Sequence, residues 1–136
     1  MKYMMMIYAN LSERHGSEPE EGESTTLSPA TRLLPNFTPE ERKAMMQAWA
    51  AFKAEAEAAG VLVSNETLYP VSDATTLRIR DGKRLISDGP FAETHEQLGG
   101  FFVLDCKDLD EAVEWAAKMP GAQYGSIEIR PVMSLG

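Results

Sequence analysis

The sequence has few cysteines, few histidines and a shortage of basic charge, and each shortage removes a class of function. Its single cysteine, Cys106, excludes a disulfide within the chain, which is typical of a protein in a reducing compartment. Its two histidines, His15 and His95, lie too far apart to match the ligand spacing of zinc sites. Thirteen Lys and Arg residues against 21 Asp and Glu residues give a net charge of -8, which repels nucleic acid. We therefore expect a cytoplasmic protein with no metal and no direct nucleic-acid partner.

Long apolar runs and cofactor motifs are also missing. The apolar stretch at residues 3–9 is far shorter than the ~20 residues that span a bilayer, and it lacks the cleavage site of a signal peptide. The chain contains no GxGxxG or P-loop glycine pattern and no Gly-x-Ser-x-Gly hydrolase elbow. We therefore expect no membrane association and no cofactor. The length of 136 residues suits a single domain over residues 1–136 that folds alone.

A polar segment interrupts the chain at about 11–36. It is rich in Ser, Thr, Glu and Pro and has few apolar anchors. Such a composition does not build a packed element, and the segment is longer than an ordinary connection. It is predicted to be an insertion that forms a mobile arm or a lid.

Two helices are predicted from their start signals and their apolar spacing. Thr38 as N-cap, Pro39 at the first position and Glu41 closing a capping box mark a helix that ends at Gly60. Its apolar stripe consists of Met45, Ala48, Trp49, Phe52, Ala56 and Ala59. Asp108 starts a second helix that ends at Pro120-Gly121. Its predicted buried stripe is Leu109, Ala112, Val113 and Ala116, widened by Trp115 and Met119.

The strands predict a ferredoxin-like α+β fold. Residues 3–9 and 101–106 are apolar on both faces, as central strands are, while residues 124–133 alternate between apolar and polar. A further strand covers residues 61–69, and the Asp81-Gly82 step marks a hairpin over residues 75–87. The order strand, helix, strand, strand, helix, strand, with the hairpin inserted between the halves, is the βαββαβ pattern of that fold.

Apolar groups on both faces of the central strands predict a homodimer. Both helices cover one face of the sheet, so a monomer would leave the apolar groups of the other face in water. A symmetric dimer formed sheet against sheet covers them, giving a dimeric α+β barrel. Ile127 and Ile129 are expected beneath the helices, so Glu128 and Arg130 point into a cavity between the two sheets.

The stretch Asp88 to Gly100, DGPFAETHEQLGG, is the least ordinary part of the sequence. Gly89 before Pro90 predicts a bend, and Gly99-Gly100 predicts a close approach of the backbone to a neighbouring segment. This stretch resembles the signature of the YCII-related, or DGPF-domain, proteins. The similarity continues through Phe101-Phe102, the predicted helices and the Arg130-Pro131-Val132 ending, so it covers nearly the whole chain outside residues 11–36.

The resemblance implies a dimeric α+β barrel and, for some relatives, a His–Asp pair proposed as an active site. Some members of the wider superfamily are lyases or isomerases acting on small products of ring cleavage, and DGPF proteins are often encoded beside extracytoplasmic-function sigma factors. Asp88 keeps the acidic position of the motif. The histidine of the pair belongs to the first helix in those relatives, and Thr38 to Gly60 contains none here; His95 stands where many relatives have Lys.

The candidate site residues are Asp88, Glu93, Gln97, Glu128 and Arg130. Asp88 acts as a general base if the cavity partly desolvates it, or else caps the turn at the following glycine. Glu93 and Gln97, four apart, would share a face of a short helix and line a pocket, or be solvated there. Arg130, with Glu128, holds a ligand carboxylate through two hydrogen bonds or forms a salt bridge between subunits.

Other reactive or polar side chains have simpler interpretations. Tyr8 and Tyr124 are expected to pack in the core or the interface, with the cavity as the alternative. Cys106 follows an apolar run without a neighbouring basic residue, so it is interpreted as a small buried hydrophobe. Arg78 and Arg80 are expected on an exposed face of the hairpin.

Two functional hypotheses follow. The first is a binding or accessory protein that takes a small anionic or aromatic ligand in a cavity near the dimer interface and is linked to sigma-factor regulation. The alternative is a small cofactor-independent lyase or isomerase, with Asp88 as general base and Arg130 holding a substrate carboxylate. A third interpretation is that the motif from Asp88 to Gly100 only builds the fold.

Overall fold

The computed structural model describes residues 1–10 and 37–136. Within these ranges the elements follow in the order β1 (Lys2–Ala9), α2 (Pro39–Ala58), β2 (Leu62–Thr67), the 3-10 helix η1 (Val71–Asp73), β3 (Thr75–Arg80), β4 (Lys83–Asp88), β5 (Gln97–Asp105), α3 (Leu109–Ala117), α4 (Gly121–Tyr124) and β6 (Ser126–Pro131). The predicted insertion at about 11–36, which includes His15, lies outside the described residues.

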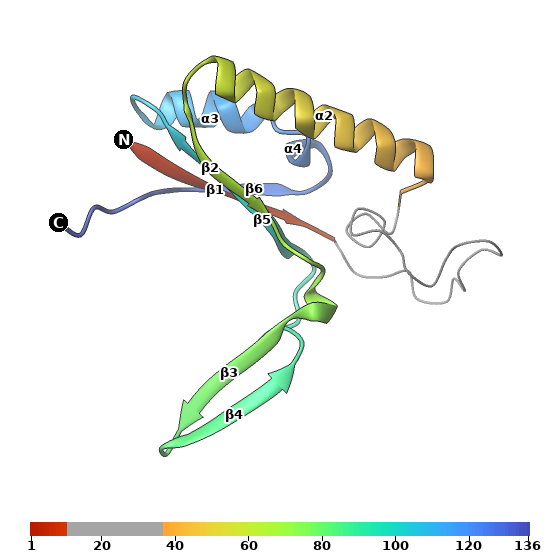
Figure 1. Cartoon of the computed structure of the whole chain (residues 1–136), viewed down its shortest axis with the longest axis vertical. Helices are drawn as coiled ribbons and strands as arrows, with labels where there is room; N and C mark the ends of the chain where they lie inside the picture. Colours follow the sequence, from red (N-terminus) through yellow and green to blue (C-terminus); the bar gives the residue numbers. More distant parts are fainter. Residues whose placement is uncertain (11–36) are drawn as a thin grey trace.

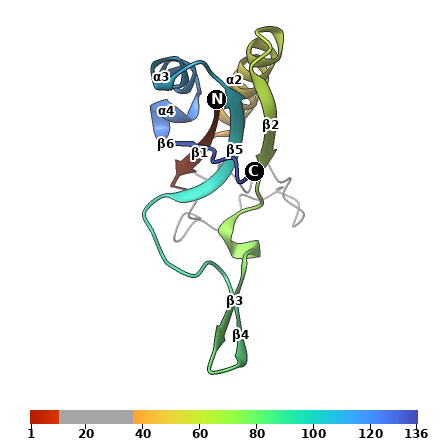
Figure 2. The same cartoon turned by 90° about the vertical axis from the view of Figure 1, so that its left-hand side faces the viewer.

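Four strands form an antiparallel sheet in the order β2-β5-β1-β6, and the helices lie on one side of it (Figure 1). This order and the βαββαβ connectivity confirm the predicted ferredoxin-like fold. Strands β3 and β4 pair with each other in a separate two-stranded sheet. This hairpin, called the arm (Thr75–Asp88), extends away from the sheet and the helices (Figure 1 and Figure 2). Asp81 and Gly82 at its tip have φ of 52° and 73°, as a type I′ turn requires, so the predicted hairpin is confirmed.

Both ends of α2 follow local signals in the sequence. The Thr38 hydroxyl accepts a hydrogen bond from the Glu41 N–H at 3.2 Å and donates one to the Glu41 carboxylate at 3.1 Å. Pro39 occupies the first helical position. At the other end, Gly60 takes a φ of 74° and the following amide, of Val61, donates to a carbonyl of the last turn at 3.2 Å. This is a Schellman motif, and it confirms the predicted start and end of the helix.

Helix α3 also begins as predicted, but it presents a different face to the sheet. The Asp108 carboxylate accepts a hydrogen bond from the Glu111 N–H at 2.9 Å. The predicted buried stripe is wrong at Leu109 and Val113, which are 54% and 47% exposed. The residues that pack against the core are Ala112, Trp115, Ala116 and Met119. Alanines on this side let the helix lie close to the sheet, so the edge with the larger aliphatic side chains is left in solvent.

Two buried positions predicted on α2, the end of α3 and the start of β6 also differ from the prediction. On α2, Ala48 and Ala59 are exposed, because the buried stripe is narrower than the apolar spacing indicated. Helix α3 ends at Ala117, before the predicted Pro-Gly stop. Tyr124 belongs to the short helix α4, so β6 starts at Ser126 and is shorter than the alternating segment.

Aromatic rings form the centre of the core between the helices and the sheet. The Phe52 ring of α2 lies edge to face against Phe102 of β5, with the ring centroids 5.1 Å apart. Its centroid is also 6.1 Å from that of Trp49 and 6.2 Å from that of Trp115. Trp49 in turn stacks on Phe102 at 5.9 Å. Met5, Leu104 and Met119 are among the largest fully buried side chains around these rings.

Two glycines are required where backbones pass closely. A Cβ on Gly100 would lie 2.7 Å from the carbonyl oxygen of Glu66 on the neighbouring strand β2. A Cβ on Gly125 would lie 2.1 Å from the carbonyl oxygen of Tyr8. Both separations are shorter than atoms tolerate, so a side chain at either position would displace a strand. The close approach predicted for the Gly99-Gly100 step is confirmed at Gly100.

Replacing Phe52 with Ala should destabilise the fold by about 3–5 kcal/mol, because the substitution leaves a cavity among several rings. The free energy of unfolding in urea measures this loss. Met46→Ala on the same helix, where the side chain is 50% exposed, is the control and should change stability by less than about 0.5 kcal/mol. Equal effects of the two substitutions would show that Phe52 is not at the centre of the core.

Candidate functional site

The side of the sheet opposite the helices is called the open face. Side chains alternate along each strand, and Tyr3, Met5 and Phe102 belong to the helix-covered core. Their sequence neighbours therefore point the other way. The open face consists of Met4, Met6, Tyr8, Ser64, Glu66, Phe101, Val103, Glu128 and Arg130.

Strand register arranges part of the open face in two rows across β6, β1 and β5. In one row Arg130 lies opposite Met4, and Met4 lies opposite Val103. Directly opposite residues of this kind have Cβ atoms about 4.5–5.5 Å apart. Val103 is only 8% exposed, Met4 is half-buried and Arg130 is exposed. The row therefore runs from a cationic rim into an apolar centre.

The second row has the opposite charge at its rim. Glu128 lies opposite Met6, Met6 lies opposite Phe101, and Phe101 lies opposite Glu66 of β2. The apolar centre continues through Met6 and Phe101, which are both half-buried. The open face thus has a positive end at Arg130 and a negative row beside it.

The predicted orientation of Glu128 and Arg130 agrees with this register. They stand two residues apart on β6, opposite Met6 and Met4, on the face away from the helices. Among residues 1–10 and 37–136, neither side chain forms an ion pair or a hydrogen bond. The guanidinium of Arg130 therefore has its donors available to a ligand or to another chain.

Asp88, Glu93 and Gln97 are placed elsewhere. Asp88 is the last residue of β4 and pairs with Thr75 at the base of the arm, on a different sheet from Arg130. Glu93 lies in the connection from the arm to the main sheet. Gln97 is the first residue of β5, at the opposite end of that strand from Asp105. Within one chain the structure does not gather these three side chains beside Arg130.

The short helix expected to carry Glu93 and Gln97 is absent, so their predicted shared face is wrong. Residues 89–96 form bends, and the Gln97 amide donates to the Thr94 carbonyl at 2.6 Å instead of continuing a helical turn. The physical reason is that Gln97 already belongs to β5, where it pairs with Ala9, so its backbone is extended. Ahead of it, Gly89 has a φ of 91°, which lies outside the helical region. The predicted bend is confirmed by the same angle.

Two residues of the arm for which the sequence predicted no such contact hold this bend. The Thr76 hydroxyl donates to the Gly89 carbonyl at 2.8 Å, and Arg78 Nη2 donates to the Phe91 carbonyl at 3.3 Å. The Gly89 N–H donates to the Ala74 carbonyl at 2.7 Å. All three bonds join segments far enough apart in the chain that no local pattern reveals them. In the part of the chain that the structure describes, the carboxylate of Asp88 takes no part in them.

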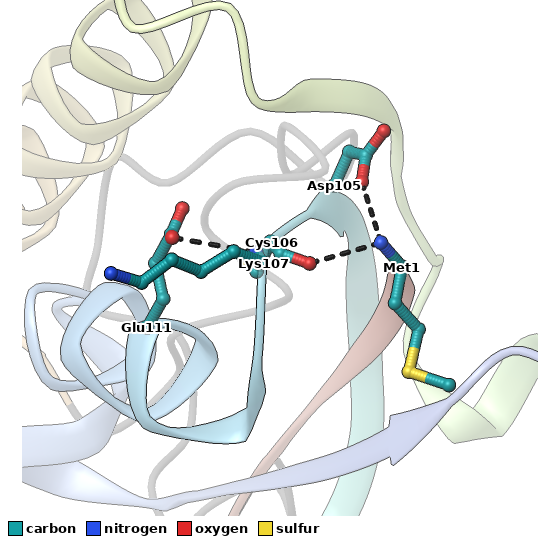
Figure 3. A network of polar contacts seen from close by, with 5 residues as sticks. All are labelled: Met1, Asp105, Cys106, Lys107 and Glu111. Carbon is teal, nitrogen blue, oxygen red and sulfur yellow. Dashed lines mark hydrogen bonds and ion pairs between the residues drawn. The ribbon is translucent and has the colours of Figure 1, made fainter.

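Cys106 lies in a small polar network that Figure 3 shows. The Met1 amino group donates to Asp105 Oδ1 and to the Cys106 carbonyl, each at 3.0 Å, and the Lys107 N–H donates to Glu111 Oε2 at 3.4 Å. The residue itself is 1% exposed. Burial, with the charges of Glu111 and Asp105 adding to it, raises the pKa of the thiol. This agrees with Cys106 as a buried hydrophobe, because a nucleophilic cysteine needs a lowered pKa and access.

The Cys106 thiol should therefore react slowly with Ellman's reagent in the folded protein. At pH 8 we expect the rate to be at least about tenfold below that of free cysteine, because the thiolate is disfavoured and the sulfur is covered. Unfolding in urea should restore the rate of an ordinary thiol, which serves as the control. Rapid reaction of one thiol in the native protein would contradict the interpretation of Cys106 as a buried hydrophobe.

The tyrosines divide between the two sides of the sheet. The Tyr124 hydroxyl accepts a hydrogen bond from Trp49 Nε1 at 3.0 Å, and its ring packs edge to face on Phe37 with centroids 5.6 Å apart. Burial raises the pKa of Tyr124, and the bond from Trp49 partly opposes the change. This agrees with the expected packing role of Tyr124, on the helix side. Tyr8 follows Met6 in the alternation of β1 and therefore shares the open face.

These features define a class: a ferredoxin-like α+β domain whose sheet is covered by helices on one side and open on the other. The sequence pattern of the YCII-related domain family matches residues 1–135, and the chain belongs to this family. An uncharacterized protein of Rhizobium meliloti (strain 1021) is 40% identical over 98 residues, which cover 71% of this chain and 79% of that relative. Among residues 1–10 and 37–136, no helix is both long and apolar enough to cross a membrane.

Proposed function

We propose that the protein is a binding or accessory protein for a small ligand that joins one carboxylate to an apolar, preferably aromatic, body. The ligand lies on the open face of the sheet, and a second copy of the chain closes the site. The observation that supports this most directly is the row that runs from Arg130, which forms no ion pair among the described residues, through Met4 to Val103.

The chemistry of the two rows fits a monocarboxylate. Arg130 offers a planar fork that binds a carboxylate through two hydrogen bonds. Met4, Met6 and Phe101 present a soft apolar surface that adapts to a ring. Glu128, in the neighbouring row, repels a second negative group, so it favours a ligand whose other end is neutral or carries a hydrogen-bond donor.

A second copy of the chain is needed to make the site a cavity. One sheet face alone leaves the ligand, and the side chains Met4, Met6 and Phe101, open to water. Packing the same face of a second chain against it covers both at once, and a two-fold arrangement uses one surface for both partners. The proposed homodimer thus supplies the low-dielectric surroundings in which an arginine–carboxylate contact is strong.

The alternative of a lyase or isomerase that uses Asp88 as general base has less support. In one chain Asp88 lies on the arm and Arg130 lies on the main sheet, so a base and a carboxylate anchor do not meet. A regulatory link to a sigma factor rests on the resemblance alone. The binding function is the one that the contacts of the open face favour.

Arg130→Gln should weaken binding of an aromatic carboxylate about 10- to 100-fold, because it removes a charge-assisted pair of hydrogen bonds. Benzoate and phenylacetate are the probes, benzamide is the neutral counterpart, and titration calorimetry together with the shift in melting temperature is the measurement. We expect the carboxylates, and not benzamide, to stabilise the unmodified protein.

Lys53→Gln is the matched control, since it removes one positive charge from the exposed surface of α2. It should leave binding unchanged. The proposal fails if neither carboxylate binds, or if Arg130→Gln and Lys53→Gln bind them as tightly as the unmodified protein does.

A further inference from the structure

The arm has little packing against the other described residues of its own chain. Its two strands pair with each other, and every arm residue except Thr76 is exposed. An isolated two-stranded hairpin is marginally stable in water at best. Figure 1 and Figure 2 show the arm leaving the end of the main sheet and turning away from the helices. Residues 1–10 and 37–136 thus provide no surface that covers the arm, and a second copy of the chain can provide one.

Register gives the arm one apolar and one basic face. Leu77 lies opposite Ile86 and Ile79 lies opposite Arg84, so these four side chains share a face. The three aliphatic ones are 56%, 66% and 60% exposed in that order. The other face carries Arg78, Arg80 and Lys83, together with Leu85, which lies opposite Arg78. The face with Leu77, Ile79 and Ile86 also carries Arg84, so it fits a surface that is apolar with acidic groups beside the apolar part.

Charge complementarity identifies the partner as a second copy of this chain. Four basic residues and two acidic residues give the arm a net charge of +2. The whole chain has a net charge of -8, so the residues outside the arm carry -10. An arm cannot reach back to its own helices when it points away from them. A second copy offers the same acidic body in another position, and a two-fold axis lets each chain hold the arm of the other.

The outer edge of α3 has the pattern that the arm requires. Leu109 and Val113, one turn apart, are 54% and 47% exposed, although their sequence pattern predicts burial. Asp110 and Glu114 form the adjacent exposed stripe of the helix. An apolar strip beside an acidic strip on α3 thus matches the arm face that carries three aliphatic side chains and Arg84.

The reach of the arm agrees with this assignment. Six residues in each strand span about 20 Å at roughly 3.3 Å per residue. In the proposed sheet-to-sheet dimer the partner's sheet lies about 10 Å away, and the partner's helices lie on the far side of that sheet, roughly another 10 Å beyond it. We propose that the arm of each chain wraps around the edge of the second copy and docks its Leu77, Ile79 and Ile86 on Leu109 and Val113 of that copy. This assignment rests on the sheet-to-sheet dimer of the proposed function.

Sedimentation equilibrium of the full chain tests the arm. Leu77→Ser combined with Ile86→Ser should raise the dimer dissociation constant at least about 100-fold, because each change is present twice in a two-fold dimer. These side chains are exposed in the single chain, so circular dichroism and melting of the dissociated variant should show an intact fold. Met46→Ser, on the exposed side of α2, is the matched control and should leave the dissociation constant unchanged.

Cross-linking tests the surface on which the arm docks. In a Cys106→Ala background, chains with Ile79→Cys are mixed with chains carrying Val113→Cys and treated with a short bis-maleimide. We expect cross-linked pairs between the two kinds of chain. A mixture in which Met46→Cys replaces Val113→Cys should give few. Equal cross-linking in the two mixtures overturns the assignment of α3.

The remaining outcomes separate the arm from the binding function. A monomeric unmodified protein overturns the arm assignment and the closed site together. A double variant that dimerises as tightly as the unmodified protein while benzoate still binds overturns the arm alone. Specific cross-linking together with no binding of benzoate or phenylacetate overturns the ligand and supports the arm.

Discussion

The contact between Phe52 and Phe102 is the constraint on which the other features depend. It fixes one face of β5 beneath α2, with the rings of Trp49 and Trp115 around it. Because side chains alternate along a strand, covering this face sends Phe101 and Val103 to the other one. The same packing that stabilises the monomer therefore creates the open face, and no local change on β5 can bury one set of side chains without exposing the other.

Features that depend on neighbouring residues could be predicted from the sequence. Thr38 and Asp108 start helices, and the Asp81-Gly82 step turns a hairpin, because each needs only side-chain or backbone bonds within a few positions. Period-two alternation likewise placed Glu128 and Arg130 on the face away from the helices. The end of the open face that carries Glu128 and Arg130 could therefore be located from the sequence, whereas the place of Glu66 on it follows only from the strand register.

Features that depend on distant contacts could not be predicted. Apolar spacing shows that α3 has an apolar side, but the rotation of the helix about its axis is set by which residues fit against the sheet, and the alanines fit more closely than Leu109 and Val113. The bonds from Thr76 and Arg78 across the bend at Gly89 join residues 13 positions apart, so no local pattern indicates them. For the same reason, the spacing of Glu93 and Gln97 by four residues indicated a short helix, whereas the backbone before Gln97 forms bends.

The stretch from Asp88 to Gly100 links the arm to the open face of the main sheet. At one end, Gly89 and its bonds set the direction in which the arm leaves; at the other, Gly100 lets β5 approach β2 closely, next to Phe101 of the open face. A substitution that widened the β2–β5 contact would move Phe101 and the base of the arm together, because both are attached to the same strand end. The stretch therefore connects the open face to the arm, with the close β2–β5 contact at one end and the bend at Gly89 at the other. That role requires glycine and proline at set positions, and it places no demand on the acid–base chemistry of Asp88.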